Sequence, residues 1–331
     1  MAKVSVLVKA LNEERHIASC LESALRAVEG LDAEVILVDS LSTDRTVELA
    51  RRYPVRIVQF QNEADRGCGA AVQLGYQVAS GEYVYLLDGD MTLRPDFLAA
   101  ALERLQADPG LAGVGGRLLD VNVRTELDRR RVLEAQALRT EVEVRTLGGG
   151  GLYRRSAIEQ VGYLGHRWLV ACEEAELGAR LGAAGWRLLR LPLDAVEHDG
   201  HQENSRQTLT RLWRSGRARA CGVFLRSALG QPWWRIVVRD QRSVLLAPGA
   251  FVASLVLVAC AAYLGASVLG ELVAATLPWL AWWAMAAIRK RSAGSAAWTV
   301  LSACLLSAGA LGGFAASPRD PMLPIAARTL K

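Results

Sequence analysis

The amino-acid sequence predicts an α/β domain with a parallel sheet, followed by a small group of transmembrane helices. Three observations lead to this prediction. Short apolar runs alternate with helix-like segments up to about residue 200, polar residues follow the ends of these runs, and charged residues become rare from residue 244 onward. Apolar strands joined by helical crossovers are typical of a parallel sheet covered on both faces. With 331 residues and 51% hydrophobic residues, the chain can form more than one folding unit.

Strands and helices are expected in alternation over the first part of the chain. The expected strands are Val4–Val8, Val35–Val38, Val55–Phe60 and Tyr83–Leu87. The expected helices are Glu13–Ala27, Thr43–Tyr53, Ala70–Ala79 and one that starts at Pro95. In parallel sheets, ligands bind beyond the carboxyl ends of the strands. Polar residues gather at those ends, in Asn12-Glu13-Glu14, Asp39-Ser40 and Asp88-Gly89-Asp90.

Three later stretches carry no charged residue and approach or reach the length that crosses a bilayer. They are Val244–Leu264, Leu272–Ile288 and Ala296–Ala316. The basic loop Arg289–Ser292 returns to the cytosol if the N-terminal domain lies there, as the positive-inside rule requires. We therefore expect about three transmembrane helices in a multi-pass protein of the inner (cytoplasmic) membrane, with its first domain in the cytoplasm. The alternative is a set of buried core helices in a soluble domain.

The segment before these stretches is rich in Arg, lacks Lys and holds a single acid, Asp240. Such a block usually binds an anionic partner, either nucleic acid or a phospholipid surface. Its Trp213, Trp233 and Trp234 favour a helix in the headgroup region, so no nucleic-acid partner is expected. The expected organisation is a sheet domain over 1–205, a basic amphipathic interfacial segment over 206–243, a membrane domain over 244–316 and a tail over 317–331. That tail would lie outside or on the interface.

The six cysteines are scattered along the chain, without a CxxC pair or a His/Cys cluster. This pattern indicates reduced thiols facing the cytosol rather than a zinc site or a disulfide framework. The apolar run at the N-terminus is too short for a signal peptide, so no cleaved targeting segment is expected.

Asp88 and Asp90 stand one residue apart at the end of a strand that reads as buried. Two carboxylates this close repel each other, and burial of either is costly. A divalent cation would neutralise them, because Mg²⁺ and Mn²⁺ prefer oxygen ligands and leave coordination positions for substrate phosphates. The pair therefore predicts a cation that stabilises a departing diphosphate.

Around this pair the sequence resembles the family 2 glycosyltransferases, whose fold is GT-A, a Rossmann-like α/β fold. The resemblance covers most of the first 200 residues, in the family's order. It rests on four stretches: "VLVKALNEERHI" (6–17), "VILVDSLSTDRTVELA" (35–50), "GAAVQLGYQVASGEYVYLLDGDMTLRPDF" (69–97) and "GGGGLYRRSAIEQVGYLG…EEAELGARLGAAGWRL" (148–188).

The resemblance implies roles for the residues at the strand ends. Asn12 and Glu13 would line the pocket for a sugar nucleotide, and Asp39 would hydrogen-bond the base. Asp88 would face the ribose or the metal, and Asp90 would be the main ligand of a Mn²⁺ or Mg²⁺ ion.

A catalytic base is expected at Glu173-Glu174, where the family places an acidic pair at the start of a helix. Inverting transfer to a hydroxyl needs a carboxylate that takes the acceptor's proton. Glu174 aligns with the family's catalytic Asp and is longer by one methylene, so either Glu173 or Glu174 can be the base. Acids are also favoured at helix N-termini, which is the alternative for this pair. The same alternative, helix capping, is preferred for Asp44.

A third metal ligand is expected in "LDAVEHDGH", where many relatives carry a histidine. His198 is the candidate and His201 its competitor, and an exposed histidine without a role is the alternative. The glycines at 148–151 would let the backbone pass close to the bound sugar. Arg154 and Arg155 either neutralise phosphate or are passive surface residues.

The expected function is the transfer of a sugar from a UDP- or GDP-sugar to a hydroxyl of a lipid-linked or glycan acceptor. A polyprenyl-phosphate sugar synthase is the first alternative, because its acceptor is an anionic phosphate that needs no base. A catalytically inactive GT-A scaffold in the membrane is the second. A processive polysaccharide synthase is not favoured, since "RQTLTRLW" (206–213) lacks the Q-x-x-R-W spacing.

Overall fold

The computed structural model describes residues 3–123, 126–199, 203 and 205–331. The chain divides into two units, one made of residues 1–208 together with 318–331 and the other of residues 209–317. The first unit is the predicted α/β domain. It also contains the C-terminal tail, which we expected to be separate.

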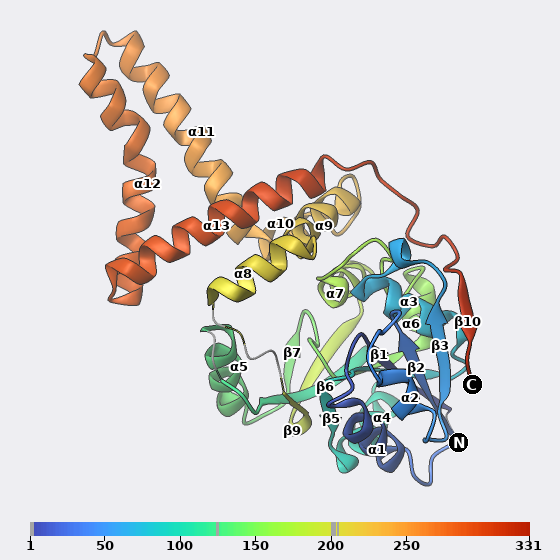
Figure 1. The fold of residues 1–331 in the computed structure, drawn as a ribbon. Coiled ribbons are helices and arrows are strands. Elements are labelled where there is room, and N and C mark those ends of the chain that lie inside the picture. The colour runs from blue at the N-terminus through green and yellow to red at the C-terminus, as the bar shows by residue number, and fades with distance from the viewer. Residues whose placement is uncertain (1–2, 124–125, 200–202, 204) are drawn as a thin grey trace. The chain divides into compact units, whose positions relative to one another are not determined.

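The first unit is built on one sheet, ten-stranded over the described residues, in the order β10-β3-β2-β1-β4-β8-β6-β9-β5, with β7 paired to β9 (Figure 1). Its strands are β1 (Val4–Ala10), β2 (Ala33–Asp39), β3 (Arg56–Phe60), β4 (Tyr83–Asp88), β5 (Met91–Leu93), β6 (Leu111–Asp120), β7 (Val142–Val144), β8 (Gly151–Arg154), β9 (Arg187–His198) and β10 (Ala327–Thr329).

The neighbouring strands β3, β2, β1 and β4 are parallel, as predicted. β1 pairs in parallel with β2 and with β4, and β2 pairs in parallel with β3. The second half is mixed, because β8 runs antiparallel to both β4 and β6. The reversal brings β9, parallel to β6, back to the same end of the sheet as β4.

The helices of this unit are α1 (Ile17–Ala27), α2 (Thr46–Ala50), α3 (Cys68–Val78), α4 (Pro95–Ala107), α5 (Glu126–Ala137), α6 (Arg155–Gln160) and α7 (Glu173–Ala183), with a 3₁₀ turn η1 over Glu63–Asp65. α4 begins at Pro95 because the fixed φ of proline suits the first helical position. α2 is shorter than the expected Thr43–Tyr53, since the side chains of residues 42–46 hold a turn instead.

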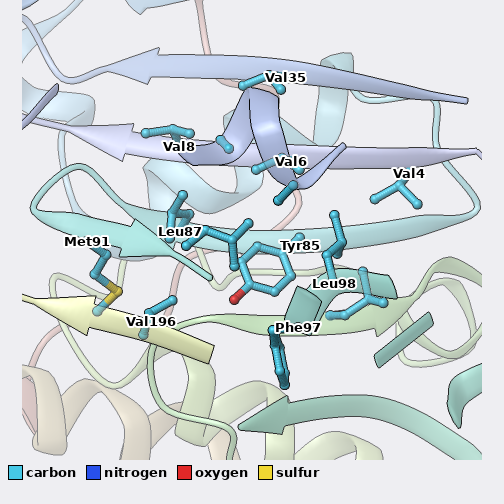
Figure 2. Packing of buried hydrophobic residues seen from close by; sticks show 14 of the residues in the cluster. Val4, Val6, Val8, Val35, Tyr85, Leu87, Met91, Phe97, Leu98 and Val196 are labelled. Atoms are coloured by element: carbon cyan, nitrogen blue, oxygen red, sulfur yellow. The ribbon is translucent and has the colours of Figure 1, made fainter. Parts of the chain in front are cut away.

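Two apolar layers cover the sheet. Figure 2 shows one of them, in which Val4, Val6 and Val8 of β1 belong to the same cluster as Tyr85 of β4 and Phe97 of α4. Alternate residues of a strand point to opposite faces, so Leu7 belongs to the other layer. Both faces of β1 are therefore buried, which explains its nearly continuous apolar run.

The second unit is helical. Its elements are η2 (Arg217–Arg219), α9 (Ala220–Ala228), α10 (Trp234–Asp240), α11 (Arg242–Tyr263), α12 (Val268–Lys290) and α13 (Ala293–Phe314), and α8 (Ser205–Arg214) joins the two units. α11, α12 and α13 are long and apolar enough to cross a membrane. They match the three predicted stretches.

A buried ion pair holds the start of α7, which carries the predicted base. Arg180 donates from Nε and a terminal nitrogen to the two oxygens of Glu176, each at 2.8 Å, and both side chains are at most 1% exposed. Tyr163 donates its hydroxyl to Glu176 at 2.6 Å, and the Arg180 guanidinium lies 3.7 Å from the Tyr163 ring centroid. The third acid of the motif is therefore structural.

Replacing Glu176 with Gln should destabilise the protein by about 3–5 kcal/mol, because Arg180 would keep a buried charge without its partner. Thermal and urea unfolding of the detergent-solubilised full chain measures the loss. Glu48→Gln is the matched control, since the Glu48–Arg45 pair is exposed and should contribute less than about 1 kcal/mol. Equal effects of the two substitutions would contradict the structural role of Glu176.

Candidate functional site

Four predicted site residues meet at the carboxyl edge of the parallel strands. β1 lies between β2 and β4, with Ala10 opposite Asp39 and Lys9 opposite Asp88. Asp39 and Asp88 therefore flank the end of β1, where Asn12 and Glu13 follow. The strand register itself places these side chains together, as expected for a parallel sheet.

Asn12 joins the ends of β1 and β2. Its φ of 59° is in the left-handed region, which Asn tolerates better than most residues. The amide oxygen of Asn12 accepts from the Thr43 N–H at 2.8 Å, and the Asn12 N–H donates to Ser42 Oγ at 2.9 Å. Asn12 thus shapes the loop after β2, beside the predicted nucleotide pocket.

Asp39 is fully buried, and its hydrogen bonds fix its orientation. Its Oδ2 accepts from the Gln59 side-chain amide at 2.7 Å and from the Ser42 N–H at 3.1 Å. Gln59 in turn accepts from Nε of Arg328, on the C-terminal strand, at 2.8 Å. The tail of the chain therefore orients the residue that we expect to bind the base.

Glu13 lies between the nucleotide side and the predicted metal side. Burial raises the pKa of Glu13, and the charge of Asp90 raises it further. His16 bridges Glu13 and Asp199, at 3.2 Å from Glu13 Oε2 and 3.1 Å from Asp199 Oδ2. His16 thereby links the loop after β1 to the segment after β9.

The structure brings Asp90 and His198 together, as the expected metal site requires. His198 lies opposite Met91 of β5 and opposite Asp120 of β6. Its Nε2 is 3.4 Å from Asp90 Oδ2, and its Nδ1 is 2.7 Å from Asp120 Oδ1. Asp120 is held by Arg131 of α5, with N–O distances of 2.7 and 2.9 Å.

The two carboxylates control the protonation of His198. Burial alone would lower the pKa of His198, but its hydrogen bonds with Asp90 and Asp120 outweigh burial and raise the pKa to about 9. Metal ligation uses the neutral imidazole, with a carboxylate on the other ring nitrogen fixing the ring orientation. Asp120 occupies that second position, so a cation would bind Nε2, in place of the proton that this nitrogen shares with Asp90.

Lys9 holds the acidic cluster together. Its Nζ is 2.7 Å from Glu173 Oε1 and 3.1 Å from Asp88 Oδ1. Burial and the neighbouring Asp90 raise the pKa of Asp88, whereas Lys9 lowers it. The ion pair with Lys9 engages Glu173 and ties α7 to the ends of β1 and β4.

Glu174 has a different environment. Its carboxylate accepts from the Gly149 N–H, at 2.9 and 3.2 Å from its two oxygens. Burial raises the pKa of Glu174 to about 7 against the opposing charge of Lys9, with smaller contributions from Glu173 and Asp88 in the same direction as burial. A carboxyl group that titrates near neutral pH suits a general base.

The glycine run before β8 supplies that N–H. Gly148, Gly149 and Gly150 have φ values of 62°, 71° and 75°. A Cβ at Gly150 would lie 2.9 Å from the hydroxyl of Tyr85, so a larger residue would be strained and crowded. The run is an ordered turn that aims Gly149 at Glu174.

Three other residues singled out in the sequence have structural contacts. Asp44 accepts from the Thr46 N–H at 2.9 Å and the Glu14 N–H at 3.0 Å, so it holds the turn before α2, whose N-cap residue is Arg45 and receives no side-chain cap. Arg154 donates to the Leu111 carbonyl at the start of β6, and Arg155 donates to the Ala79 carbonyl ahead of β4, both at the end of the sheet away from Asp88. The phosphate-neutralising alternative for these two arginines is therefore wrong.

Within the parts of the chain that the structure describes, no group of three or more His, Cys, Asp or Glu side chains is arranged to hold a metal ion. His201, the competitor of His198, lies outside the described residues. Asp90 and His198 nevertheless form an oxygen-and-nitrogen pair of the kind that binds Mn²⁺ or Mg²⁺ when substrate phosphates complete the coordination.

Lys9, Asp120 and His16 were missed by sequence reasoning. Lys9 carries a usable signal, since it is the one charged residue in β1, whose other residues are apolar except for Ser5. Asp120 and His16 carry no such signal in the sequence. The partner of Asp120, His198, lies 78 residues away along the chain, and Asp199, the partner of His16, lies 183 residues away.

The model of the family "Glycosyl transferase family 2" matches residues 5–162. The dolichol-phosphate mannosyltransferase of Pyrococcus furiosus is 30% identical over 119 residues, which cover 35% of this chain and 33% of that protein. The putative glycosyltransferase EpsH of Bacillus subtilis is 30% identical over 167 residues, 47% of this chain and 48% of that protein. The chain thus spans less than half the length of these relatives.

Solved structures share the fold. The mannosyltransferase PcManGT of Pyrobaculum calidifontis, in complex with GDP-Man and Mn²⁺, superposes with a TM-score of 0.62 at 22% identity, covering 95% of this chain and 87% of that one. Residues 1–349 of S. aureus TarS, in complex with UDP-GlcNAc, superpose with a TM-score of 0.55 at 17% identity, covering 88% and 92%. Residues 5–162 are therefore similar to the glycosyl transferase family 2 model, and the chain shares the fold of these solved structures.

Proposed function

We propose that the protein is an inverting glycosyltransferase. It moves a sugar from a nucleotide diphosphate sugar to a hydroxyl of a lipid-linked or glycan acceptor, at the cytoplasmic face of the membrane. The observation that carries the proposal is that the acids have different environments. Asp90 pairs with His198, and Glu173 is engaged by Lys9. Glu174 accepts a hydrogen bond from a backbone N–H, and the pKa of its carboxyl group is about 7.

The donor would bind across the carboxyl edge of the parallel strands. Asp39, oriented by Gln59, accepts a hydrogen bond from the nucleobase, while Asn12 and Glu13 line the nucleotide pocket. The complexes of the two structural relatives with GDP-Man and UDP-GlcNAc support a UDP- or GDP-sugar as the donor class.

Asp90 and His198 would hold a divalent cation, Mn²⁺ or Mg²⁺, and Asp88 would supply a further carboxylate at the end of β4. When bound, such a cation neutralises the charge that develops on the departing diphosphate. Asp120 fixes the ring of His198, and Arg131 fixes Asp120.

Glu174 would act as the base. The acceptor hydroxyl attacks the anomeric carbon, its proton passes to Glu174, and the bond from that carbon to the diphosphate oxygen breaks. Glu173 is less suited to this step, since Lys9 at 2.7 Å stabilises its charged form and occupies one of its oxygens. The geometry thus favours Glu174 over Glu173.

A phosphate acceptor is the second candidate, supported by the similarity to a dolichol-phosphate mannosyltransferase. That reaction needs no base, because the acceptor is already anionic. An inactive scaffold is the third candidate and predicts no transfer from any donor. Activity of the wild type and of Glu174 variants separates the three.

Asp90→Ala should lower donor turnover at least about 100-fold, because charge stabilisation on the diphosphate by the cation contributes several kcal/mol. Transfer and hydrolysis are measured on a panel of UDP- and GDP-sugars with Mn²⁺. Asp96→Ala is the matched control, since Asp96 is an exposed acid at the start of α4. Equal activity of Asp90→Ala and the wild type would rule out the metal site.

Glu174→Gln should lower kcat by about 10²–10⁴-fold and leave the affinity for the donor nearly unchanged, because the amide keeps the shape but cannot accept a proton. Donor binding is followed by calorimetry and transfer by product chromatography. Full transfer by this variant would instead support the phosphate-acceptor reaction.

The pH profile offers a separate measurement. The pKa of Glu174 is raised to about 7, and only its carboxylate form accepts a proton, so kcat/KM should fall as the pH drops through about 7. Assays between about pH 5 and pH 9 at saturating metal give the profile. A profile without a step near neutral pH would exclude Glu174 as the titrating base.

A further inference from the structure

The C-terminal tail is part of the catalytic sheet. β10 pairs antiparallel with β3, with Arg328 opposite Gln59. Three further backbone hydrogen bonds extend the pairing: Ile57 N–H to Lys331 O, Leu330 N–H to Ile57 O, and Gln61 N–H to Ala326 O, at 2.8–3.1 Å.

The stretch before β10 is fastened to the same unit. Arg167, a buried side chain, donates to the carbonyls of Leu323 and Pro324 at 2.7 and 2.8 Å. The Trp168 indole donates to Asp320 O at 2.9 Å. Residues 320–331 therefore belong to the catalytic unit.

This pairing limits how the chain can cross a membrane. The chain leaves the catalytic unit before α11 and returns to it after α13, so both points lie on one side of any bilayer. The number of complete crossings between them must be even. Three full crossings would place Pro318 on the far side of the membrane. The chain after Pro318 would then have to pass back through the lipid without helical structure, which would leave its backbone polar groups, Arg319 and Asp320 without hydrogen-bond partners there.

α11 and α12 form the pair of crossings. They have 22 and 23 residues, about 33–35 Å at 1.5 Å per residue, and they pack against each other, with Ser254 Oγ donating to Ala275 O at 2.7 Å. The link between them, residues 264–267, carries no charge, whereas Arg289, Lys290 and Arg291 follow at the other end. A hairpin with its basic end in the cytoplasm obeys the positive-inside rule.

α13 does not run alongside α11 and α12 over their length. It starts beside the end of α12, where Trp283 Nε1 donates to Ala293 O at 3.3 Å. Fourteen residues later, Ser307 Oγ donates to Val244 O, in the first turn of α11, at 2.7 Å. About 21 Å along its axis, α13 is therefore still at the base of the hairpin, and Figure 1 draws it running across rather than alongside.

The second half of α13 is covered by the basic segment that precedes the hairpin. Its small residues allow this close approach: a Cβ at Gly309 would lie 2.7 Å from Ala218 O, and one at Gly313 would lie 2.1 Å from Arg219 O. Arg219 also donates to Gly312 O at 3.2 Å, near the end of the helix. On other sides, Leu301, Leu305 and Leu311 are 52%, 38% and 60% exposed.

We infer that the protein crosses the bilayer twice, through α11 and α12, and that α13 is an interfacial helix on the cytoplasmic side. The basic segment around η2 and α9 faces the headgroups, and the exposed leucines of α13 enter the acyl region. The inference rests on the membrane location in the proposed function but not on sugar transfer. It replaces the expected third crossing.

Cysteine accessibility in spheroplasts of a bacterial expression host tests this topology. Cys221, Cys260 and Cys304 are first replaced by Ser, while the cysteines of the catalytic unit stay as internal controls. Single cysteines are then placed at Ala266, Lys290 and Ala315, which are all exposed. A membrane-impermeant maleimide should label position 266 in intact spheroplasts, and positions 290 and 315 only after permeabilisation.

Labelling of position 315 from outside would overturn the inference, since three crossings predict that result. Protection of position 266 would overturn it as well, because the hairpin would then not cross. A Gln59→Cys/Arg328→Cys pair checks the premise, and failure to form a disulfide under oxidation would contradict the docked tail. Sugar transfer measured on the same membranes separates a wrong topology from a wrong function.

Discussion

The position of Lys9 is the constraint on which the catalytic edge depends. Four carboxyl groups, those of Asp88, Asp90, Glu173 and Glu174, gather where strands and a helix meet, and their mutual repulsion opposes folding. Lys9 joins two of them at 2.7 and 3.1 Å. Burial alone would lower the pKa of Lys9, but Asp88 and Glu173 hold it well above its ordinary value, so the ammonium stays charged. The ammonium group of Lys9 in β1 thus allows these acids to lie close together without a bound substrate.

Much of the fold could be predicted because the strands of the first half are buried on both faces. Continuous apolar runs made β1, β2 and β4 visible in the sequence, and uncharged stretches did the same for α11–α13. The short strands β5, β7 and β10 were not predicted, since three residues carry no usable periodicity and owe their form to neighbouring strands.

The site was predictable where its residues follow a strand within a quoted motif. Asp39 and Asp88 lie at the sheet edge for that reason, and Asp90 meets His198 because β5 pairs with β9. The choice between Glu173 and Glu174 was not accessible, because it depends on Lys9, a residue more than 160 positions away. The number of membrane crossings could not be predicted from the sequence either. Hydropathy shows which helices are apolar, but it does not show that the C-terminal tail pairs with β3.

The docked tail has a consequence for the edge of the sheet. β3 would be an edge strand without β10, with its N–H and C=O groups open to pairing with another chain. β3 has four buried residues out of five, so such an exposed edge would be prone to intermolecular association. A soluble fragment cut before the membrane helices would lose β10 and the contact of Arg328 with Gln59, the residue that donates to Asp39. The last residues of the chain therefore belong to any fragment meant to represent the catalytic domain.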